Sequence, residues 1–123
     1  MQINSHKDLI VWQKGVELSK QIYLLTESFS KKEVFGLTSQ MRRAAVSIPS
    51  NIAEGRSRGT RKDFVQFLRI ALGSASELET QIEISKKLPE SEKHSYREVD
   101  ILLDEVSRML MAMIKKLSIK ASP

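Results

Sequence analysis

The chain has 123 residues, 41% of them hydrophobic, and a formal net charge of +5. This length suits one domain with its own core, and the absence of cysteine excludes disulfides, thiolate metal sites and a cysteine nucleophile. Charged residues interrupt the first thirty positions, and no apolar run approaches the roughly 20 residues that span a bilayer. We therefore expect a soluble, cytoplasmic protein without a leader peptide or a membrane partner.

The first expected helix begins at Asp8, a suitable N-cap, and runs to about Phe29. Its apolar residues form two overlapping stripes, so we expect burial on two sides. Trp12 and Tyr23 lie in one stripe and are expected in the core or between subunits, because no aromatic residue interleaves with the basic turn later in the chain. Gly15 is expected to mark the close approach of another helix.

The second expected helix opens at Leu37, and its apolar residues keep helical spacing as far as Ile52. Pro49 lies within this run. Proline has no N–H to donate to the carbonyl of Ala45 and its ring clashes there, at a cost of about 3 kcal/mol. Because the spacing continues beyond it, Pro49 predicts a kink, and Gly55 is the predicted end of the helix.

A third helix is expected to begin at Thr60, which forms a capping-box pattern with Asp63. It should end before Pro89, since proline disfavours the helical conformation of the preceding residue. Gly73 inside this helix is interpreted as a packing residue. The core positions are spaced as in the seam of a bundle: Phe64, Leu68, Ala71, Leu72, Ala75, Leu78 and Ile82.

The fourth helix is expected to start at Glu90, Ser91 or Ser95. Its core positions keep the same spacing: Val99, Leu103, Val106, Leu110, Met113 and Leu117. Further apolar residues lie beside this stripe, and excess apolar surface favours self-association. They are Leu102, Met109 and Ile114.

Four helical segments joined by short polar connections predict an all-α protein. The expected architecture is an antiparallel up-down-up-down four-helix bundle with the second helix kinked at Pro49. The single bundle domain is expected to cover residues 8–118, between flexible termini at residues 1–7 and 119–123.

Positive charge is concentrated in one part of the chain. Residues 31–69 hold nine Lys or Arg against three acids, a net +6, whereas residues 1–30 are neutral and residues 70–123 carry −1. A local surplus of this kind is typical of a surface that binds a polyanion.

Two groups of bases in this segment are candidate sites. Arg42 and Arg43 point about 100° apart on the second helix, so they are not expected to face the same partner. In one interpretation, at least one of them faces a polyanion or the pore of an oligomer. In the other, they are solvated or paired with a glutamate of the third helix. The second group surrounds the start of the third helix, where unpaired amides and the helix dipole favour phosphate; the alternative is a solvated loop. It consists of Arg56, Arg58, Arg61 and Lys62.

Asn51 and Glu54 lie near Pro49 on one helix face. Glu54 could act as a general base, but no nucleophile, histidine or second carboxylate is placed by spacing to join it. Both residues are therefore interpreted as structural, with Asn51 satisfying groups freed by Pro49 and Glu54 pairing with Arg58 or Arg43. The two histidines lack metal-binding spacing. No enzyme activity, metal or cofactor is expected.

Three segments of the chain resemble one known family. They are DLIVWQK near the start, SIPSNIAEG with the arginine turn and FLRIALGSASELETQ in the middle, and VSRMLMAMIKKL near the end. From about Asp8 to Leu117 the chain is similar to the four-helix bundle proteins known as 23S rRNA-intervening-sequence proteins. The resemblance implies a bacterial helical bundle that assembles as a ring-like homopentamer. It also implies a likeness to the accessory variability protein of diversity-generating retroelements, a basic bundle that partners a reverse transcriptase and nucleic acid.

The family name records the location of genes and not a mechanism. We predict a non-enzymatic oligomeric bundle that binds nucleic acid, RNA or DNA and most plausibly structured RNA, through backbone phosphates. The alternative is a scaffold that docks a nucleic-acid-processing protein without strong RNA affinity of its own. The predicted phosphate-binding residues are Arg42, Arg43, Arg56, Arg58, Arg61 and Lys62.

Overall fold

The computed structural model describes residues 5–121, with all of their side chains except those of residues 33–35, 120 and 121. Short 3-10 or π-helical turns cover His6–Asp8, Lys31–Glu33, Val34–Thr38 and Ser91–Lys93. No strand occurs between residues 5 and 121, so the all-α prediction is confirmed. The α-helices are α1 (Ile10–Glu27), α2 (Ser39–Ser57), α3 (Arg61–Lys86) and α4 (Arg97–Ala121).

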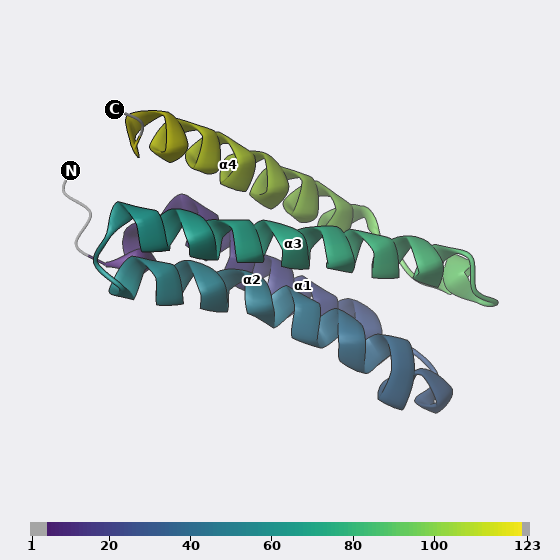
Figure 1. Ribbon diagram of the computed structural model, residues 1–123. Coiled ribbons are helices and arrows are strands. Elements are labelled where there is room, and N and C mark those ends of the chain that lie inside the picture. The colour runs from purple at the N-terminus through teal and green to yellow at the C-terminus, as the bar shows by residue number, and fades with distance from the viewer. Residues whose placement is uncertain (1–4, 122–123) are drawn as a thin grey trace.

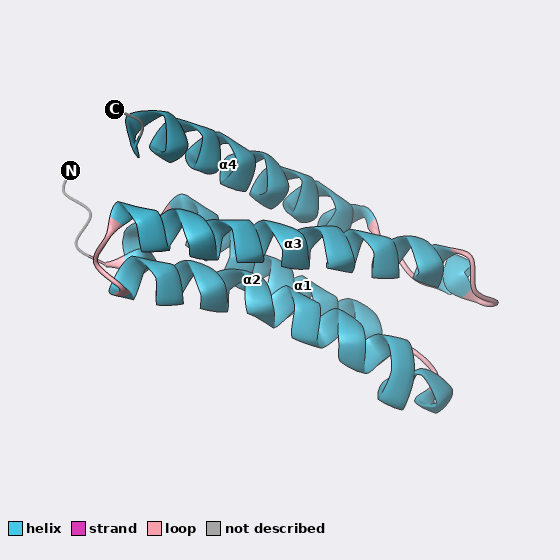
Figure 2. Ribbon diagram, viewed as in Figure 1, coloured by secondary structure: helices cyan, strands magenta, loops and turns pink. Residues whose placement is uncertain are grey.

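The four helices form a bundle, as predicted (Figure 1). The chain reverses direction at each connection, and the loops gather at the two ends of the bundle (Figure 2). α1 and α3 each pack against both α2 and α4. α2 continues through Pro49 without interruption, and the kink predicted there stays a prediction.

The core is a single cluster of side chains from all four helices. The three- and four-residue spacing of α3 is reflected directly in its buried residues, which are Leu68, Ala71, Ala75, Leu78 and Ile82. In α4, Leu102 and Ile114 are also buried, with exposed fractions of 9% and 7%. These two residues were expected to provide excess apolar surface for self-association. That expectation is wrong, because both side chains complete the core of their own chain.

The starts of α1 and α3 depend on local turns. The residue before α1 is Leu9, whose backbone is extended, and Asp8 belongs to a separate 3-10 turn. The predicted Asp8 cap is therefore wrong. Thr60 does cap α3, since its hydroxyl accepts a hydrogen bond from the Asp63 amide at 3.1 Å.

α4 is shifted from its expected bounds. It begins at Arg97, after all three expected starts, because Ser91–Lys93 forms its own 3-10 turn after Glu90, whose backbone is left-handed. It continues to Ala121, past the domain boundary expected at residue 118. Of the predicted flexible ends, residues 1–4, 122 and 123 lie outside the described part of the chain.

Two helical glycines have roles other than those expected. α2 continues past Gly55 to Ser57, and the chain turns at Gly59, whose φ of +86° favours glycine. Gly55 is buried against α3, where a Cβ would lie 2.5 Å from the Cβ of Phe67. Gly55 is thus a packing residue, and its predicted role as the helix end is wrong. At Gly73 a Cβ would meet nothing within 4 Å, so its predicted packing role is wrong as well.

The carbonyl that Pro49 leaves without a helical donor is satisfied from α1. The Ser19 hydroxyl donates to the carbonyl oxygen of Ala45 at 3.0 Å. Gly15 permits this approach, since a Cβ there would already lie 3.4 Å from the Cβ of Pro49. Gly15 therefore marks a close helix contact, as predicted.

Candidate nucleic-acid interface

One end of the bundle holds the C-termini of α2 and α4 and the N-termini of α1 and α3 (Figure 1). A hollow of about 170 Å³ there is lined by Arg56 and Arg61 together with Leu117 of α4. Further along α3, the Arg69 guanidinium donates to the Ser118 hydroxyl at 3.4 Å. The last turns of α4 therefore lie beside the α2–α3 turn.

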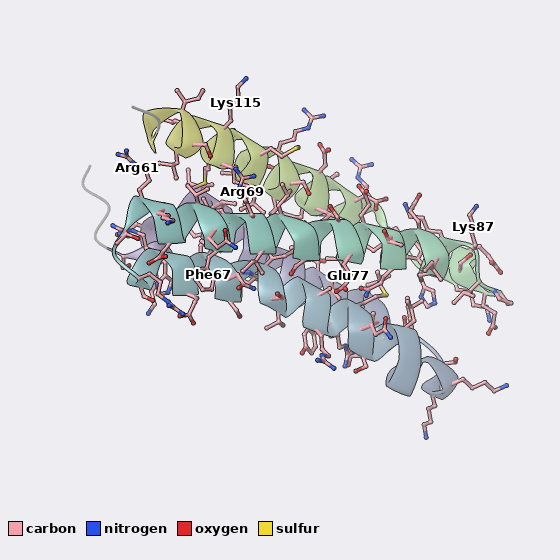
Figure 3. All side chains as sticks on the ribbon, viewed as in Figure 1. Arg61, Phe67, Arg69, Glu77, Lys87 and Lys115 are labelled. Carbon is pink, nitrogen blue, oxygen red and sulfur yellow. The ribbon has the colours of Figure 1, made fainter. Side chains whose placement is uncertain are left out.

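This arrangement adds bases to the predicted cluster. Lys115 and Lys116 are exposed on the same turns of α4 as Leu117. Figure 3 shows Arg61, Arg69 and Lys115 in one half of the molecule and Lys87 at the opposite end. We call the combined set the basic end: Arg56, Arg58, Arg61, Lys62, Arg69, Lys115 and Lys116.

Arg58 is held at the basic end by two neighbours. Its Nε donates to Glu54 Oε2 at 3.0 Å, and its guanidinium carbon lies 5.0 Å from the centre of the Phe67 ring. The pairing of Glu54 with Arg58 agrees with the sequence interpretation. Both side chains are about half exposed, so the guanidinium stays accessible to solvent and to a ligand.

Charge at the basic end is unbalanced. Residues 54–69 and 115–118 contain seven Lys or Arg and two acids, Glu54 and Asp63, which is a net +5. The first-turn amides of α3 and the positive end of its dipole are at the same place. Thr60 accepts from one of these amides, that of Asp63. The arrangement can therefore hold several phosphate groups at once.

A second candidate surface lies near the start of α2, where this helix packs against α1. Arg42 donates from Nε to the Thr26 hydroxyl at 2.8 Å, and its guanidinium carbon lies 4.5 Å from the centre of the Tyr23 ring. Arg42 is therefore fixed on α1, whereas Arg43 is exposed. In the described structure neither arginine pairs with the α3 glutamates that were considered as partners.

Both arginines line one open groove of about 610 Å³. Side chains about 100° apart on a helix can flank one groove, and the prediction that they do not face the same partner stays a prediction. Tyr23 is 45% exposed here, so it does not lie in the core of its own chain, and the alternative expectation of a contact between subunits stays a prediction. We call this surface the α1–α2 groove, lined by Tyr23, Thr38, Ser39, Arg42, Arg43, Val46 and Ser47.

Asn51 connects α2 with α3. Its Nδ2 donates to the carbonyl of Ser47 at 2.8 Å and to the hydroxyl of the same residue at 2.9 Å. That hydroxyl lies 2.8 Å from the Ser74 hydroxyl of α3. The group freed by Pro49 is served by Ser19 from α1. The role predicted for Asn51 at the proline is therefore wrong.

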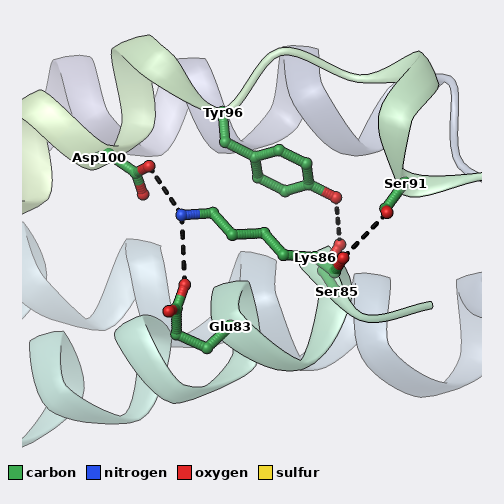
Figure 4. A network of polar contacts seen from close by, with 6 residues as sticks. All are labelled: Glu83, Ser85, Lys86, Ser91, Tyr96 and Asp100. Carbon is green, nitrogen blue, oxygen red and sulfur yellow. Dashed lines mark hydrogen bonds and ion pairs between the residues drawn. The ribbon is translucent and has the colours of Figure 1, made fainter.

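The opposite end of the bundle, residues 83–100, has its lysines largely paired, and we call it the paired end. Lys86 Nζ lies 2.8 Å from Asp100 and 3.2 Å from Glu83, so that one ammonium connects α3 with α4 (Figure 4). The hydrogen bond with Asp100, reinforced by Glu83, raises the pKa of Lys86 above its usual value. Lys93 forms an ion pair with Glu90.

The described residues also bear on metal binding and on membrane insertion. Within them, no three His, Asp or Glu side chains lie close enough to hold a metal ion. None of the described helices carries an apolar stretch long enough to cross a membrane. The centres of the His94 and Phe29 rings lie 4.7 Å apart, and His94 Nδ1 lies 3.1 Å from the Ser28 hydroxyl. His94 therefore belongs to the contact between two loops.

Comparison with known proteins agrees with this architecture. The model of the family described as 23S rRNA-intervening sequence protein matches residues 7–112. The chain is also similar to a crystal structure from Bacteroides thetaiotaomicron, described as a protein with unknown function from the S23 ribosomal protein family. The two share 26% identity with a TM-score of 0.73, over 86% of this chain and 96% of that chain. No curated protein matches the chain. The likeness to the accessory variability protein stays a prediction.

Proposed function

The chain belongs to the family of 23S rRNA-intervening sequence proteins, and we propose that it binds nucleic acid, RNA in particular, through backbone phosphates on the basic end. The observation that carries the proposal is the gathering of seven bases and only two acids from three helices. The proposed role is binding without catalysis.

Binding would follow from charge neutralisation and geometry. Arginine guanidinium groups can hold a phosphate with two parallel hydrogen bonds, and lysines add charge without a fixed direction. Contacts of this kind read the backbone and not the bases. The affinity should therefore depend little on sequence and strongly on salt, with a slope of about −0.9 per phosphate neutralised in a plot of log K against log salt.

The test compares two matched variants by fluorescence anisotropy with a labelled RNA hairpin at several salt concentrations. Arg61→Gln combined with Lys62→Gln removes two charges at the basic end. Lys87→Gln combined with Lys31→Gln removes two exposed charges at the other end of the bundle. We expect the first pair to lower the affinity and to reduce the salt slope by about two. The second pair should leave both quantities close to those of the wild type.

Two outcomes would contradict the proposal: an affinity that does not change with salt, or equal losses in both double variants. Weak binding of the hairpin by the wild type, together with recovery of one dominant protein partner from cells, would favour the alternative. In that case the protein would be a scaffold that docks a nucleic-acid-processing protein.

Self-association is a second proposal, and the exposed apolar side chains favour it. They occur on all four helices: Ile10, Val16, Leu24, Val46, Ile70, Ile84, Ile101, Met111 and Ile119. The family resemblance implies five copies in a ring. Several basic ends in one particle would raise the affinity by multivalency. Light scattering should then give a multiple of the 14.0 kDa chain mass, and a monomer would contradict this proposal.

A further inference from the structure

We infer that the α1–α2 groove receives one unpaired nucleotide of the bound RNA. The base lies against Tyr23 and Arg42, and the phosphate lies beside Arg43. The inference rests on the proposed function and extends it, because the basic end alone does not distinguish single strands from duplexes.

The groove has a suitable size and shape. Its volume of about 610 Å³ lies within the range of about 300–1,000 Å³ that is usual for small-molecule sites. It is open to solvent, so a nucleotide that is still part of a strand can enter it. A duplex cannot, because its bases are already stacked and paired.

A stacking surface is already in place. Tyr23 keeps 45% of its surface exposed although the Arg42 guanidinium lies 4.5 Å above the ring centre. The hydrogen bond from Arg42 Nε to the Thr26 hydroxyl fixes the guanidinium in this position. Aromatic rings and guanidinium planes are the two surfaces on which proteins stack unpaired bases. Both are present in the groove.

The groove also offers unused hydrogen-bonding capacity. Thr38 is only 2% exposed, and its hydroxyl has no hydrogen-bond partner in the described structure. A buried polar group in that state is unfavourable unless a ligand or water satisfies it. Ser39 lies beside it in the groove lining. The Thr38 hydroxyl is itself covered, so the partly exposed Ser39 is the residue whose hydroxyl the edge of a base can meet.

The charge of the groove selects an anion. Two of its lining residues are arginines and none is acidic. Arg43 is exposed and makes no ion pair with any side chain that the structure describes. Tyr23 and Val46 supply apolar surface in the groove, and the two arginines flank it. A planar polar ring with a phosphate attached fits this chemistry better than an acidic helix.

One strand can reach both surfaces. Arg43 and Arg58 lie fifteen residues apart along α2, which is about 22 Å at a rise of about 1.5 Å per helical residue. That distance corresponds to roughly six or seven nucleotides at about 3.4 Å each. An oligonucleotide of about twelve residues is therefore long enough to contact the groove and the basic end together.

The experiment measures the affinities of a 12-nucleotide single strand and a 12-base-pair RNA duplex at one salt concentration. The wild type should prefer the single strand. Tyr23→Ala should reduce that preference by about 5- to 150-fold, the range for loss of one stacked base, while Tyr23→Phe should keep it. The double variant Arg61→Gln and Lys62→Gln should weaken both ligands equally. Circular dichroism verifies that each variant is folded.

A titration with adenosine 5′-monophosphate separates the inference from the proposed function. The titration is followed by the NMR chemical shifts of the backbone amides. Shift changes confined to Tyr23 and residues 38–47 support the groove as a nucleotide site, even if the basic end binds nothing. If both RNAs bind and the Tyr23→Ala variant prefers the single strand over the duplex as strongly as the wild type does, the inference is wrong and the proposed function stands. Shifts produced by a glutamate-rich peptide but not by the nucleotide would also overturn it, because they would assign the groove to an acidic peptide.

Discussion

The two ends of the bundle contain the same kinds of side chains in different proportions. At the paired end, residues 83–100 include four bases and five acids, and the ammonium groups of Lys86 and Lys93 are already engaged. At the basic end, seven bases accompany two acids. The excess of bases over acids, and not the number of lysines and arginines, therefore distinguishes a surface suited to a polyanion.

The two ends are also assembled differently. The paired end is built from neighbouring segments, since the end of α3 and the start of α4 supply both signs of charge. The basic end combines the α2–α3 turn with the last turns of α4, which are about fifty residues further along the chain. Bringing these segments together adds Lys115 and Lys116 to the bases of the α2–α3 turn.

The largest expected effect concerns the bases that only the fold adds to the basic end. Replacing Lys115 and Lys116 with glutamine should weaken RNA binding by on the order of 10-fold per charge at about 0.1 M salt, if each neutralises one phosphate. Lys87→Gln serves as the control at the paired end. An unchanged affinity in the α4 variant would restrict the binding surface to the α2–α3 turn.

A second prediction addresses the packing beneath the basic end. Gly55→Ala places a methyl group 2.5 Å from the Cβ of Phe67. It should lower the free energy of unfolding by about 1–3 kcal/mol, as overpacking usually does. Gly73→Ala is the matched control, because it has free space and should gain up to about 1 kcal/mol from helix propensity. Urea denaturation of both variants measures the contrast, and equal shifts would refute the close contact.

A third prediction alters the paired end. Asp100→Asn removes the stronger partner of Lys86 and should cost about 0.2–1 kcal/mol of stability, the range for exposed ion pairs. It also raises the net charge there by one, while Lys86 keeps its ion pair with Glu83. If local excess matters, the RNA affinity should rise far less than it falls when the basic end loses one charge. A comparable change would erase the distinction between the two ends.

The smallest expected effect is a dependence on alkaline pH. The pKa of Lys86 is raised in the folded protein, chiefly by its hydrogen bond with Asp100. The stabilisation is therefore fully present below the ordinary lysine pKa, and it is lost as the pH rises through the raised value. The stability difference between the wild type and Lys86→Gln should accordingly shrink as the pH increases above about 10.5. A difference that stays constant up to the highest pH tested would show that the ion pair contributes nothing.

The helices were predictable because burial at every third or fourth position is visible in the sequence. The ends of the helices were harder to predict. Gly55 and Gly59 both suit a helix end, and the choice between them depends on Phe67, which packs on Gly55 from the next helix. Likewise, the Ala45 carbonyl freed by Pro49 finds its donor in Ser19, 26 residues earlier in the chain.

The candidate site was predictable only where it is continuous in sequence. Arg56, Arg58, Arg61 and Lys62 stand out as a basic turn. Lys115 lies in a segment that is slightly acidic as a whole, so a charge count along the chain does not reveal it. The α1–α2 groove was missed because Tyr23 and Arg42 belong to different helices, and spacing within one helix cannot show that they meet.

Pro49, Gly15 and Ser19 have a consequence for how the sequence can vary. Sliding α1 by one residue against α2 would turn the serine away and leave the Ala45 carbonyl without its donor, so the contact selects one register of the two helices. A relative with another residue in place of the proline regains the backbone N–H and no longer needs the serine. We therefore expect the three positions to covary among relatives of this chain.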